Sequence, residues 1–324
     1  MNTQEKIVSY IKQRGEVAGV EIARHLGITK QALFRYLPKL LESKVIAKIG
    51  KPPRVFYSIN KELVITDPEA GLSEIEKKKI AEHFFVITPF GERMEGAPAF
   101  IYWCNKNKLP PKKTAAEYIK TLEKYEHYKR NGLIDGAEKM KSTFTNVYLD
   151  KIFYLDFYSI ERFGKTKLGQ LLLYAKQSQN LDLMNEIIKI AKPKIREIIK
   201  NYKIDGVGFI PPTVKRERQF MRVLETGLGE KIRTISIEKA KTFVAVPQKT
   251  LTKLEDRIEN ASRTIMVTEK STFKNILLID DAVGSGATLN ETAKKIKERG
   301  ICKGKVIGLA LTGSFKGFDI ISEV

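Results

Sequence analysis

The chain has 324 residues, enough for two or three domains of ordinary size. Lys and Arg outnumber Asp and Glu by 58 to 38, a net charge of +20, which indicates polyanionic partners such as nucleic acid or phosphorylated ligands. Cys104 and Cys302 are far apart, which argues against a disulfide framework and a cysteine zinc site, so we expect a cytoplasmic protein. No apolar run approaches the roughly 20 residues of a membrane-spanning helix, and we expect no membrane partner.

Residues 1–60 repeat apolar side chains at helical spacing in three places and then change to strand character. Gly27 suits a left-handed helix end, and the Thr29 hydroxyl can cap the helix that follows. VIAKI and VFYSI flank GKPPR and predict a hairpin. The segment resembles the winged helix-turn-helix family, and that resemblance implies sequence-selective binding of duplex DNA, commonly as a dimer. We therefore expect residues 1–60 to be a winged helix-turn-helix DNA-binding domain.

Basic and amide side chains of this segment are candidates for DNA contacts. At about 100° per residue, three of them fall opposite the leucine stripe of the third helix, and others occupy its first turn and the hairpin tip. Eleven Lys or Arg against four Glu favour a phosphate backbone as the partner, although a protein-interaction module with a basic face is the alternative. Pro38 lies inside the third helix and predicts a kink there. The candidates are Lys30, Gln31, Arg35, Lys39, Lys51 and Arg54.

Residues 61–149 carry a weaker signal, and we expect a mainly helical linker or accessory segment. GLSEIEKKKIAEHFF has Ser73 and Glu76 at the spacing of a capping box. AAEYIKTLEKYEHYKR predicts a second helix whose aromatic residues form the edge of a core. The three histidines are isolated from one another, so no direct metal-binding motif is present.

The carboxyl half alternates apolar runs with helical segments. The runs are almost continuous, which predicts strands buried on both faces of a parallel, Rossmann-like α/β sheet. NETAKKIKERG lies between the last two and completes a βαβ unit. Ligands of such sheets bind beyond the carboxyl ends of the strands. The predicted strands are GVGFI (206–210), TFVAV (242–246), NILLI (275–279) and KVIGLAL (305–311).

Two acids and a glycine loop follow the strand NILLI. The Asp280 and Asp281 carboxylates can accept hydrogen bonds from vicinal hydroxyls or hold a hydrated Mg²⁺. Gly284 and Gly286 let the backbone approach an anion, and the next helix begins there. A diol on the acids and a phosphate in the loop describe ribose 5-phosphate.

The stretch ILLIDDAVGSGAT resembles the phosphoribosyl-pyrophosphate (PRPP) motif of type I phosphoribosyltransferases. A response-regulator receiver domain also begins with an apolar strand and paired acids, but only 43 residues follow Asp281, too few for the rest of that fold. A Walker B strand is excluded because the sequence contains no GxxxxGK[ST] loop. A buried strand with a solvated acidic turn would leave the glycine spacing unexplained. The resemblance implies a phosphate-binding loop of Ala282, Val283, Gly284, Ser285, Gly286, Ala287 and Thr288.

Two upstream stretches, GFIPPTVKRERQF and VPQKTLTKLEDRIEN, are similar to the ComF branch of that superfamily, so the resemblance spans residues 150–324. Gln219 departs from the family's usual glycine. The resemblance implies Mg²⁺ as the cofactor of PRPP, although an ordinary basic surface remains an alternative for each cation. It assigns pyrophosphate binding to Pro211, Pro212, Thr213, Arg216 and Arg218, and catalysis to Asp280, Asp281, Lys249 and Arg257.

The expected fold is thus an α/β phosphoribosyltransferase domain preceded by a winged-helix domain and a mainly helical middle segment. Two functions fit this combination. In one, the protein is a homodimeric transcriptional regulator that responds to PRPP or a nucleotide. In the other, it is an active Mg²⁺-dependent phosphoribosyltransferase of the ComF-like type.

Overall fold

The computed structural model describes residues 2–43, 45–60, 71–229 and 232–314. Up to residue 60 the chain forms three helices and an antiparallel sheet of order β1-β3-β2. These residues have a hydrophobic core of their own, which includes Ile7, Leu33 and Tyr57. The elements are α1 (Thr3–Arg14), β1 (Glu16–Ala18), α2 (Gly19–Leu26), α3 (Lys30–Glu42), β2 (Ile46–Lys51) and β3 (Arg54–Ile59).

The turn between α2 and α3 has the features expected from the sequence. Gly27 has a φ of 64°, and the Thr29 hydroxyl accepts a hydrogen bond from the Ala32 amide at 3.1 Å. The helix α3 continues through Pro38, which lies on its exposed side. The helices and the hairpin are therefore where the sequence predicts them, while the winged-helix assignment stays a prediction.

Residues 71–149 contain four helices and four short strands. The capping box at Ser73 and Glu76 is present. The strands β4 and β5 form a hairpin, and β7 joins the main sheet by pairing with β8. The elements are α4 (Glu74–His83), β4 (Phe85–Ile87), β5 (Arg93–Glu95), α5 (Gly96–Lys106), α6 (Pro111–Glu126), β6 (Lys129–Arg130), β7 (Leu133–Asp135) and α7 (Ala137–Thr143).

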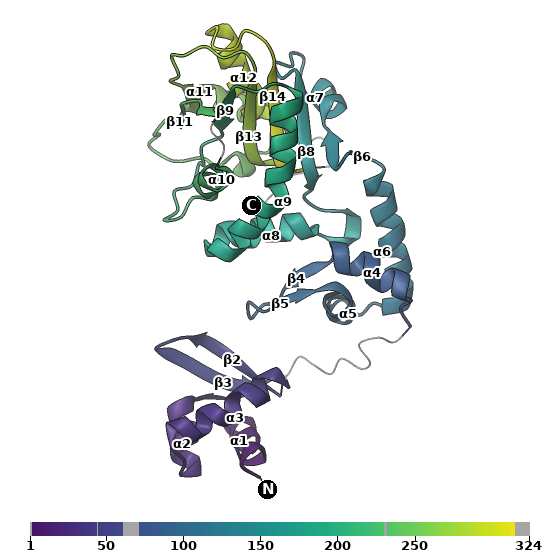
Figure 1. The fold of residues 1–324 in the computed structure, drawn as a ribbon, viewed down its shortest axis with the longest axis vertical. Helices are drawn as coiled ribbons and strands as arrows, with labels where there is room; N and C mark the ends of the chain where they lie inside the picture. Colours follow the sequence, from purple (N-terminus) through teal and green to yellow (C-terminus); the bar gives the residue numbers. More distant parts are fainter. Residues whose placement is uncertain (1, 44, 61–70, 230–231, 315–324) are drawn as a thin grey trace.

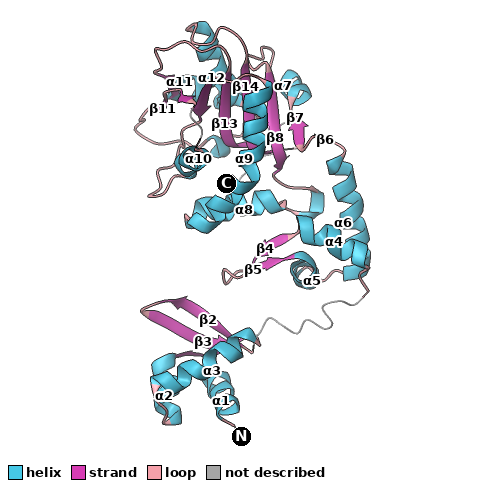
Figure 2. Cartoon of the chain, in the orientation of Figure 1, coloured by secondary structure: helices cyan, strands magenta, loops and turns pink. Residues whose placement is uncertain are grey.

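A seven-stranded sheet of order β10-β9-β13-β14-β8-β7-β6 forms the centre of the carboxyl half. The expectation of a parallel sheet is correct for β10 through β8 and wrong beyond it, because β7 and β6 pair antiparallel. Together with its helices this mixed sheet forms an α/β arrangement (Figure 2). Its remaining strands are β8 (Lys151–Phe157), β9 (Gly206–Phe209), β10 (Arg233–Thr234), β13 (Ile276–Val283) and β14 (Val306–Gly313).

Both faces of this sheet are buried. Leu277 and Ile279 pack with α8, α9 and α10, whereas Ile276 and Leu278 pack with α12 on the opposite face. In Figure 1, α9 crosses in front of the strands. The alternation explains why NILLI reads as a continuous apolar run. The helices are α8 (Lys167–Ser178), α9 (Leu181–Asn201), α10 (Phe220–Leu228), α11 (Leu254–Thr264) and α12 (Ala287–Glu298), with short 3-10 turns at Glu161–Phe163 and Gln248–Thr250.

The prediction of a strand at TFVAV (242–246) is wrong. These residues form a loop in which Phe243 is fully exposed and Val244 is 65% exposed. A strand needs a hydrogen-bonding neighbour. The preceding strand β11 (Ile237–Lys239) pairs with β12 (Ile265–Val267) instead, and the loop lies between β11 and α11.

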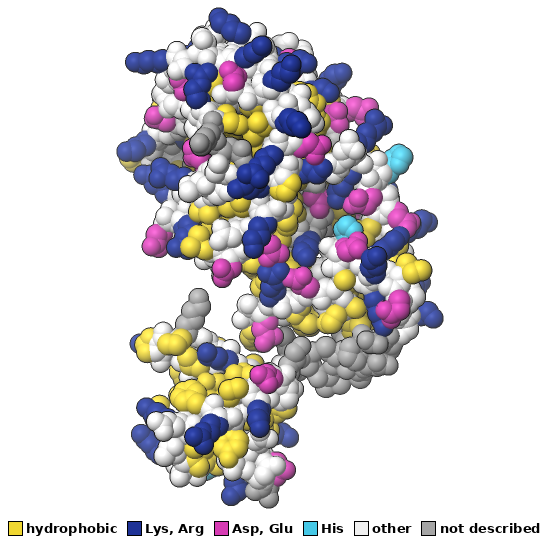
Figure 3. Space-filling view, in the orientation of Figure 1, with side chains coloured by type: hydrophobic (Ala, Val, Ile, Leu, Met, Phe, Trp, Pro, Cys, Tyr) yellow, Lys and Arg dark blue, Asp and Glu magenta, His cyan; other side chains and the backbone are white. Residues whose placement is uncertain are grey.

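Lys and Arg side chains are scattered over the face seen in Figure 3 and do not gather in one patch. The net charge therefore does not mark a single interface on that face. Within the described residues, no helix combines the length and the apolar character needed to cross a membrane.

Candidate functional site

A cavity opens at the carboxyl end of β13, where the acid pair lies. It is also lined by the segment after β9, by β11 and by the first turn of α12. The cavity brings together most residues assigned to PRPP, whereas the side chain of Lys249 lies outside the described part of the chain. The assigned residues that line it are Pro211, Pro212, Thr213, Arg216, Arg218, Arg257, Asp280, Asp281, Ala282, Val283, Gly284, Ser285, Gly286, Ala287 and Thr288.

The glycine loop ends at the amino terminus of α12. Gly286 is the N-cap of this helix with a φ of 91°, a conformation that favours glycine, and as a glycine it has no side chain of its own to cap the helix. The Ser285 hydroxyl accepts a hydrogen bond from the Ala287 amide at 3.3 Å. The first turn of a helix presents unpaired amides and a partial positive charge. The loop can therefore receive a phosphate group.

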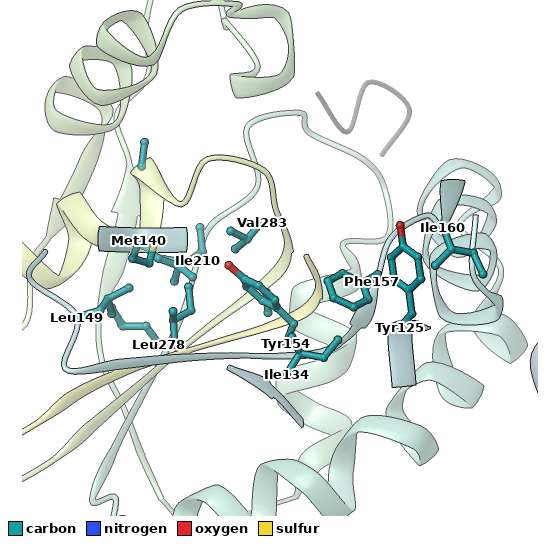
Figure 4. Packing of buried hydrophobic residues seen from close by; sticks show 14 of the residues in the cluster. Tyr125, Ile134, Met140, Leu149, Tyr154, Phe157, Ile160, Ile210, Leu278 and Val283 are labelled. Carbon is teal, nitrogen blue, oxygen red and sulfur yellow. The ribbon is translucent and has the colours of Figure 1, made fainter. Parts of the chain in front are cut away.

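Helix α7, from the segment that the sequence left unexplained, lies directly behind this loop. A Cβ atom at Gly286 would lie 2.6 Å from the Met140 sulfur, and the Phe144 ring is also in contact range. Figure 4 shows Met140, Tyr154 and Val283 close together in the core under the loop. A side chain larger than that of glycine at position 286 would therefore collide with α7.

A hydrogen-bond chain also ties α7 to the loop. Lys139 donates from Nζ to the Ser314 carbonyl at 3.0 Å and to the Ser314 hydroxyl at 2.6 Å. Ser314 in turn donates from Oγ to the Gly284 carbonyl at 3.4 Å and from its amide to the Val283 carbonyl at 3.0 Å. The backbone at the start of the loop is thus held by a side chain that is remote in sequence.

Two lysines accompany the acid pair. Lys176 of α8 forms an ion pair with Asp281, with 2.6 Å between Nζ and Oδ2. Lys239 of β11 donates to the Thr213 hydroxyl at 2.6 Å and interacts electrostatically with Asp280. Burial and, secondly, the charge of Asp281 raise the pKa of the Asp280 carboxyl to about 7, while the two lysines lower it. Burial lowers the pKa of Lys239.

The segment after β9 is braced by Gln219. Gln219 donates from Nε2 to the Val214 carbonyl at 3.2 Å and to the Arg216 carbonyl at 3.3 Å. The Arg218 guanidinium donates to the Gln179 carbonyl at 2.8 Å. These side-chain contacts hold the backbone of the segment in place.

Arg257 is almost fully buried yet lines the cavity. Its Nε donates to the Leu251 carbonyl at 2.8 Å, and Gln248 donates from Nε2 to the Arg257 carbonyl at 3.0 Å. Burial lowers the pKa of the guanidinium, which nevertheless stays charged at neutral pH. Together with Lys176, Lys239, Arg216 and Arg218, this makes five cations against two carboxylates in the lining, a balance suited to an anionic ligand.

A Mg²⁺ ion held by the protein alone does not fit the acid pair. One oxygen of Asp281 already pairs with Lys176, and the described residues contain no group of three or more His, Cys, Asp or Glu that could hold a metal ion. Mg²⁺ is usually bound through one or two carboxylates, water and substrate phosphates. An ion at this site would have to arrive with the ligand.

Sequence reasoning missed Lys139, Lys176 and Lys239. Each comes from an element distant in the sequence from the acid pair, and each resembles the many other lysines of the chain. The β6–β7 hairpin that precedes α7 did carry a signal. Asn131 and Gly132 both have positive φ, and an Asn-Gly pair between two strands is a common hairpin turn.

The residues assigned to DNA contacts lie in residues 1–60. Leu33, Leu37 and Leu40 of α3 are buried, so the opposite side of this helix faces solvent, and Phe34 is 59% exposed on it. The side chain of Lys51 lies outside the described part of the chain. The assigned residues with exposed side chains are Lys30, Gln31, Arg35, Lys39 and Arg54.

Comparison with known proteins adds little to this geometry. No protein-family model matches the chain. No curated protein matches it either. Among solved structures, the chain is similar to a hypoxanthine phosphoribosyl transferase of Trypanosoma cruzi, with 11% identity and a TM-score of 0.28 over 42% of this chain and 68% of the other.

Proposed function

We propose that the protein binds PRPP, or a nucleotide that shares its ribose 5-phosphate group, in the cavity at the end of β13. We further propose that residues 1–60 bind duplex DNA as a winged helix and that the protein is a homodimeric, ligand-responsive transcriptional regulator. The observation that carries the proposal is the cavity, where an acid pair and a helix amino terminus lie among five cations. In this arrangement the acids accept hydrogen bonds from a ribose diol, while the loop amides and the cations receive its phosphate groups.

Mg²⁺ has a limited place in this proposal. The ion commonly accompanies pyrophosphate groups, and we propose that it enters bound to the ligand. Arg216, Arg218 and Arg257 would lie near the pyrophosphate. The planar guanidinium group of arginine favours bidentate contacts with phosphate oxygens.

Calorimetric titration with PRPP tests the proposed ligand. The wild-type chain should bind, and Asp280→Asn combined with Asp281→Asn should weaken binding by about a hundredfold or more, because the diol loses two charged acceptors. Inorganic pyrophosphate is the control ligand, since it lacks the diol and should bind the double variant at least as well as wild type. Equal PRPP affinity in the two proteins would refute the assignment of the acid pair.

A second candidate function is phosphoribosyl transfer. The observation that favours it is Arg257, a buried cation in the cavity of the acid pair. Charge that develops on departing pyrophosphate would be stabilised by such a preorganised cation. Release of pyrophosphate from PRPP in the presence of nucleobases, abolished by Arg257→Met, would support this function. If the protein binds PRPP tightly but releases no pyrophosphate, the result would favour the ligand-responsive regulator over the enzyme.

A further inference from the structure

Part of the acid pair is already engaged by the chain itself. Asp281 pairs through Oδ2 with Lys176 Nζ at 2.6 Å, and the two side chains are only 17% and 13% exposed. Asp280 uses Oδ1 to accept a hydrogen bond from the Asp281 amide at 2.8 Å. Each carboxylate therefore has one oxygen committed before any ligand binds.

The ammonium of Lys176 is held in position by the packing of its helix. Leu172 and Ala175 of α8 are fully buried against the sheet, in the cluster that also contains Leu277 and Ile279 of β13. The backbone of α8 is thereby fixed against the sheet, where the helix contacts β8 and β14. Lys176 is thus a fixed charge of the site and differs from a flexible lysine at the surface.

The second ammonium completes the charge balance. Lys239 reaches the cavity from β11, is anchored on the Thr213 hydroxyl at 2.6 Å and acts on Asp280 through its charge. Two carboxylates therefore face two ammonium groups. A divalent ion on the acids would have to displace Lys176 or lie beside it, and like charges at such short range repel.

The oxygens that remain suit hydroxyl groups. Asp280 Oδ2 and Asp281 Oδ1 have no hydrogen-bond partner among the described residues, and both acids line the cavity. Each is a charged acceptor for one hydroxyl donor. A vicinal diol supplies two donors side by side, one for each acid.

We propose that Lys176 takes the place of a metal ion at the acid pair, so that the site binds a ribose 5-phosphate group without Mg²⁺. The inference rests on the proposed function and goes beyond it, because the phosphoribosyltransferase resemblance implies Mg²⁺ as a cofactor. Lys176 is a positioning residue in this account. Its charge offsets that of Asp281, and the ion pair leaves Asp281 Oδ1 free to accept a hydrogen bond from the diol.

The test is calorimetric titration of the full chain with ribose 5-phosphate, which carries no pyrophosphate that would bring Mg²⁺ with it. Wild type should bind with affinities within about threefold of each other in excess Mg²⁺ and in EDTA. Lys176→Met should lose about tenfold or more in EDTA and regain part of that loss in Mg²⁺, because the ion can then occupy the vacated place. Lys176→Arg should resemble wild type.

Lys167→Met is the matched control. Lys167 belongs to the same helix and is also paired, to Glu95 at 3.2 Å, but it does not line the cavity. This variant should bind as wild type does in both buffers. Loss of wild-type binding in EDTA, which needs no variant, would overturn the inference, and so would a Lys176→Met protein that matches wild type in both buffers. Absence of ribose 5-phosphate binding in every buffer would instead refute the proposed function.

Discussion

At the scale of single residues, Asp280 is the group whose protonation matters most for the site. Its pKa is raised to about 7 from an ordinary value of 3.8, mainly by burial. The folded protein therefore binds a proton at Asp280 over a pH range in which the unfolded chain has released it. Stability conferred by the protonated form is present at low pH and is lost as pH rises toward 7.

Asp280→Asn should consequently stabilise the protein at alkaline pH. Asparagine cannot ionise, so at about pH 8 the variant should unfold with a free energy about 1 to 3 kcal/mol higher than wild type. The difference should shrink toward about pH 5, where wild type is protonated. Urea unfolding at the two pH values measures it. Asp281→Asn serves as the contrast and should destabilise, because it leaves Lys176 without its partner. An Asp280→Asn protein less stable than wild type at pH 8 would contradict this account.

Discrimination between sugars follows from the two free carboxylate oxygens. The ligand 2-deoxyribose 5-phosphate lacks one hydroxyl and would leave one half-buried charged acceptor without a donor. It should bind about tenfold to a hundredfold more weakly than ribose 5-phosphate, the usual result of an unpaired polar group in a binding site. Competition against a fluorescent nucleotide measures the ratio. Indistinguishable competition by the two sugars would show that the acids do not contact the diol.

At the scale of elements, the glycine loop depends on α7. Gly286→Ala would introduce both a positive-φ alanine and a methyl group 2.6 Å from the Met140 sulfur. Binding of ribose 5-phosphate should fall about tenfold as the loop shifts, and stability should fall by about 1 to 3 kcal/mol.

Gly300→Ala separates the two effects. Gly300 also has a positive φ, 64°, but an added Cβ would meet nothing within 4 Å. It should lose stability through backbone strain alone and keep ligand affinity. Met140→Ala in the Gly286→Ala background should restore part of the affinity, since it removes the sulfur. If Gly300→Ala reduced the affinity for ribose 5-phosphate as much as Gly286→Ala does, the role of α7 would be disproved.

Helix α3 carries the prediction for DNA. Arg35→Ala should reduce discrimination between duplex sequences, because arginine commonly contacts base edges from such a helix. Arg54→Ala should weaken binding to all duplexes alike, and the slope of log affinity against log salt concentration should become smaller by about one. Lys12→Ala on α1 removes the same charge and should have little effect. Fluorescence anisotropy over a range of salt concentrations measures the DNA affinity of all three variants. Equal losses of sequence discrimination in Arg35→Ala and Lys12→Ala would contradict the proposal that α3 contacts the bases.

How far the sequence predicts each element depends on its length and its local signals. The strands β9, β13 and β14 were predicted because long apolar runs reflect burial on both faces, and α12 was predicted from its periodicity and Gly300. The strands β6 and β7 have only two and three residues, too few for a periodic pattern. The error at residues 242–246 shows the converse. A β-branched run reads as a strand even where no neighbouring strand is available.

The predictability of the site also depends on whether its residues are adjacent in the sequence. The acids and the glycine loop are contiguous in sequence, so their association could be predicted from residue order alone. Lys176 and Lys239 reach Asp281 and Asp280 only through the packing of α8 and β11. Nothing in their local sequence distinguishes them, and tertiary structure was needed to find them.

At the scale of the whole molecule, the proposal joins a ligand site and a DNA-binding segment in one chain. A ligand shifts the equilibrium between two states only as far as it binds one of them more tightly. In a homodimer, a change in the spacing of the two amino-terminal segments would alter the fit to two DNA half-sites. The same free energy must then appear in both directions of the coupling.

The most direct test of this central claim is a reciprocal pair of titrations at one fixed salt concentration. DNA affinity is measured with and without saturating PRPP, and PRPP affinity is measured with and without saturating operator DNA. The account predicts that PRPP changes DNA affinity by about 5-fold to 150-fold and that DNA changes PRPP affinity by the same factor. Unchanged affinities in both titrations, with both ligands shown to bind, would contradict it.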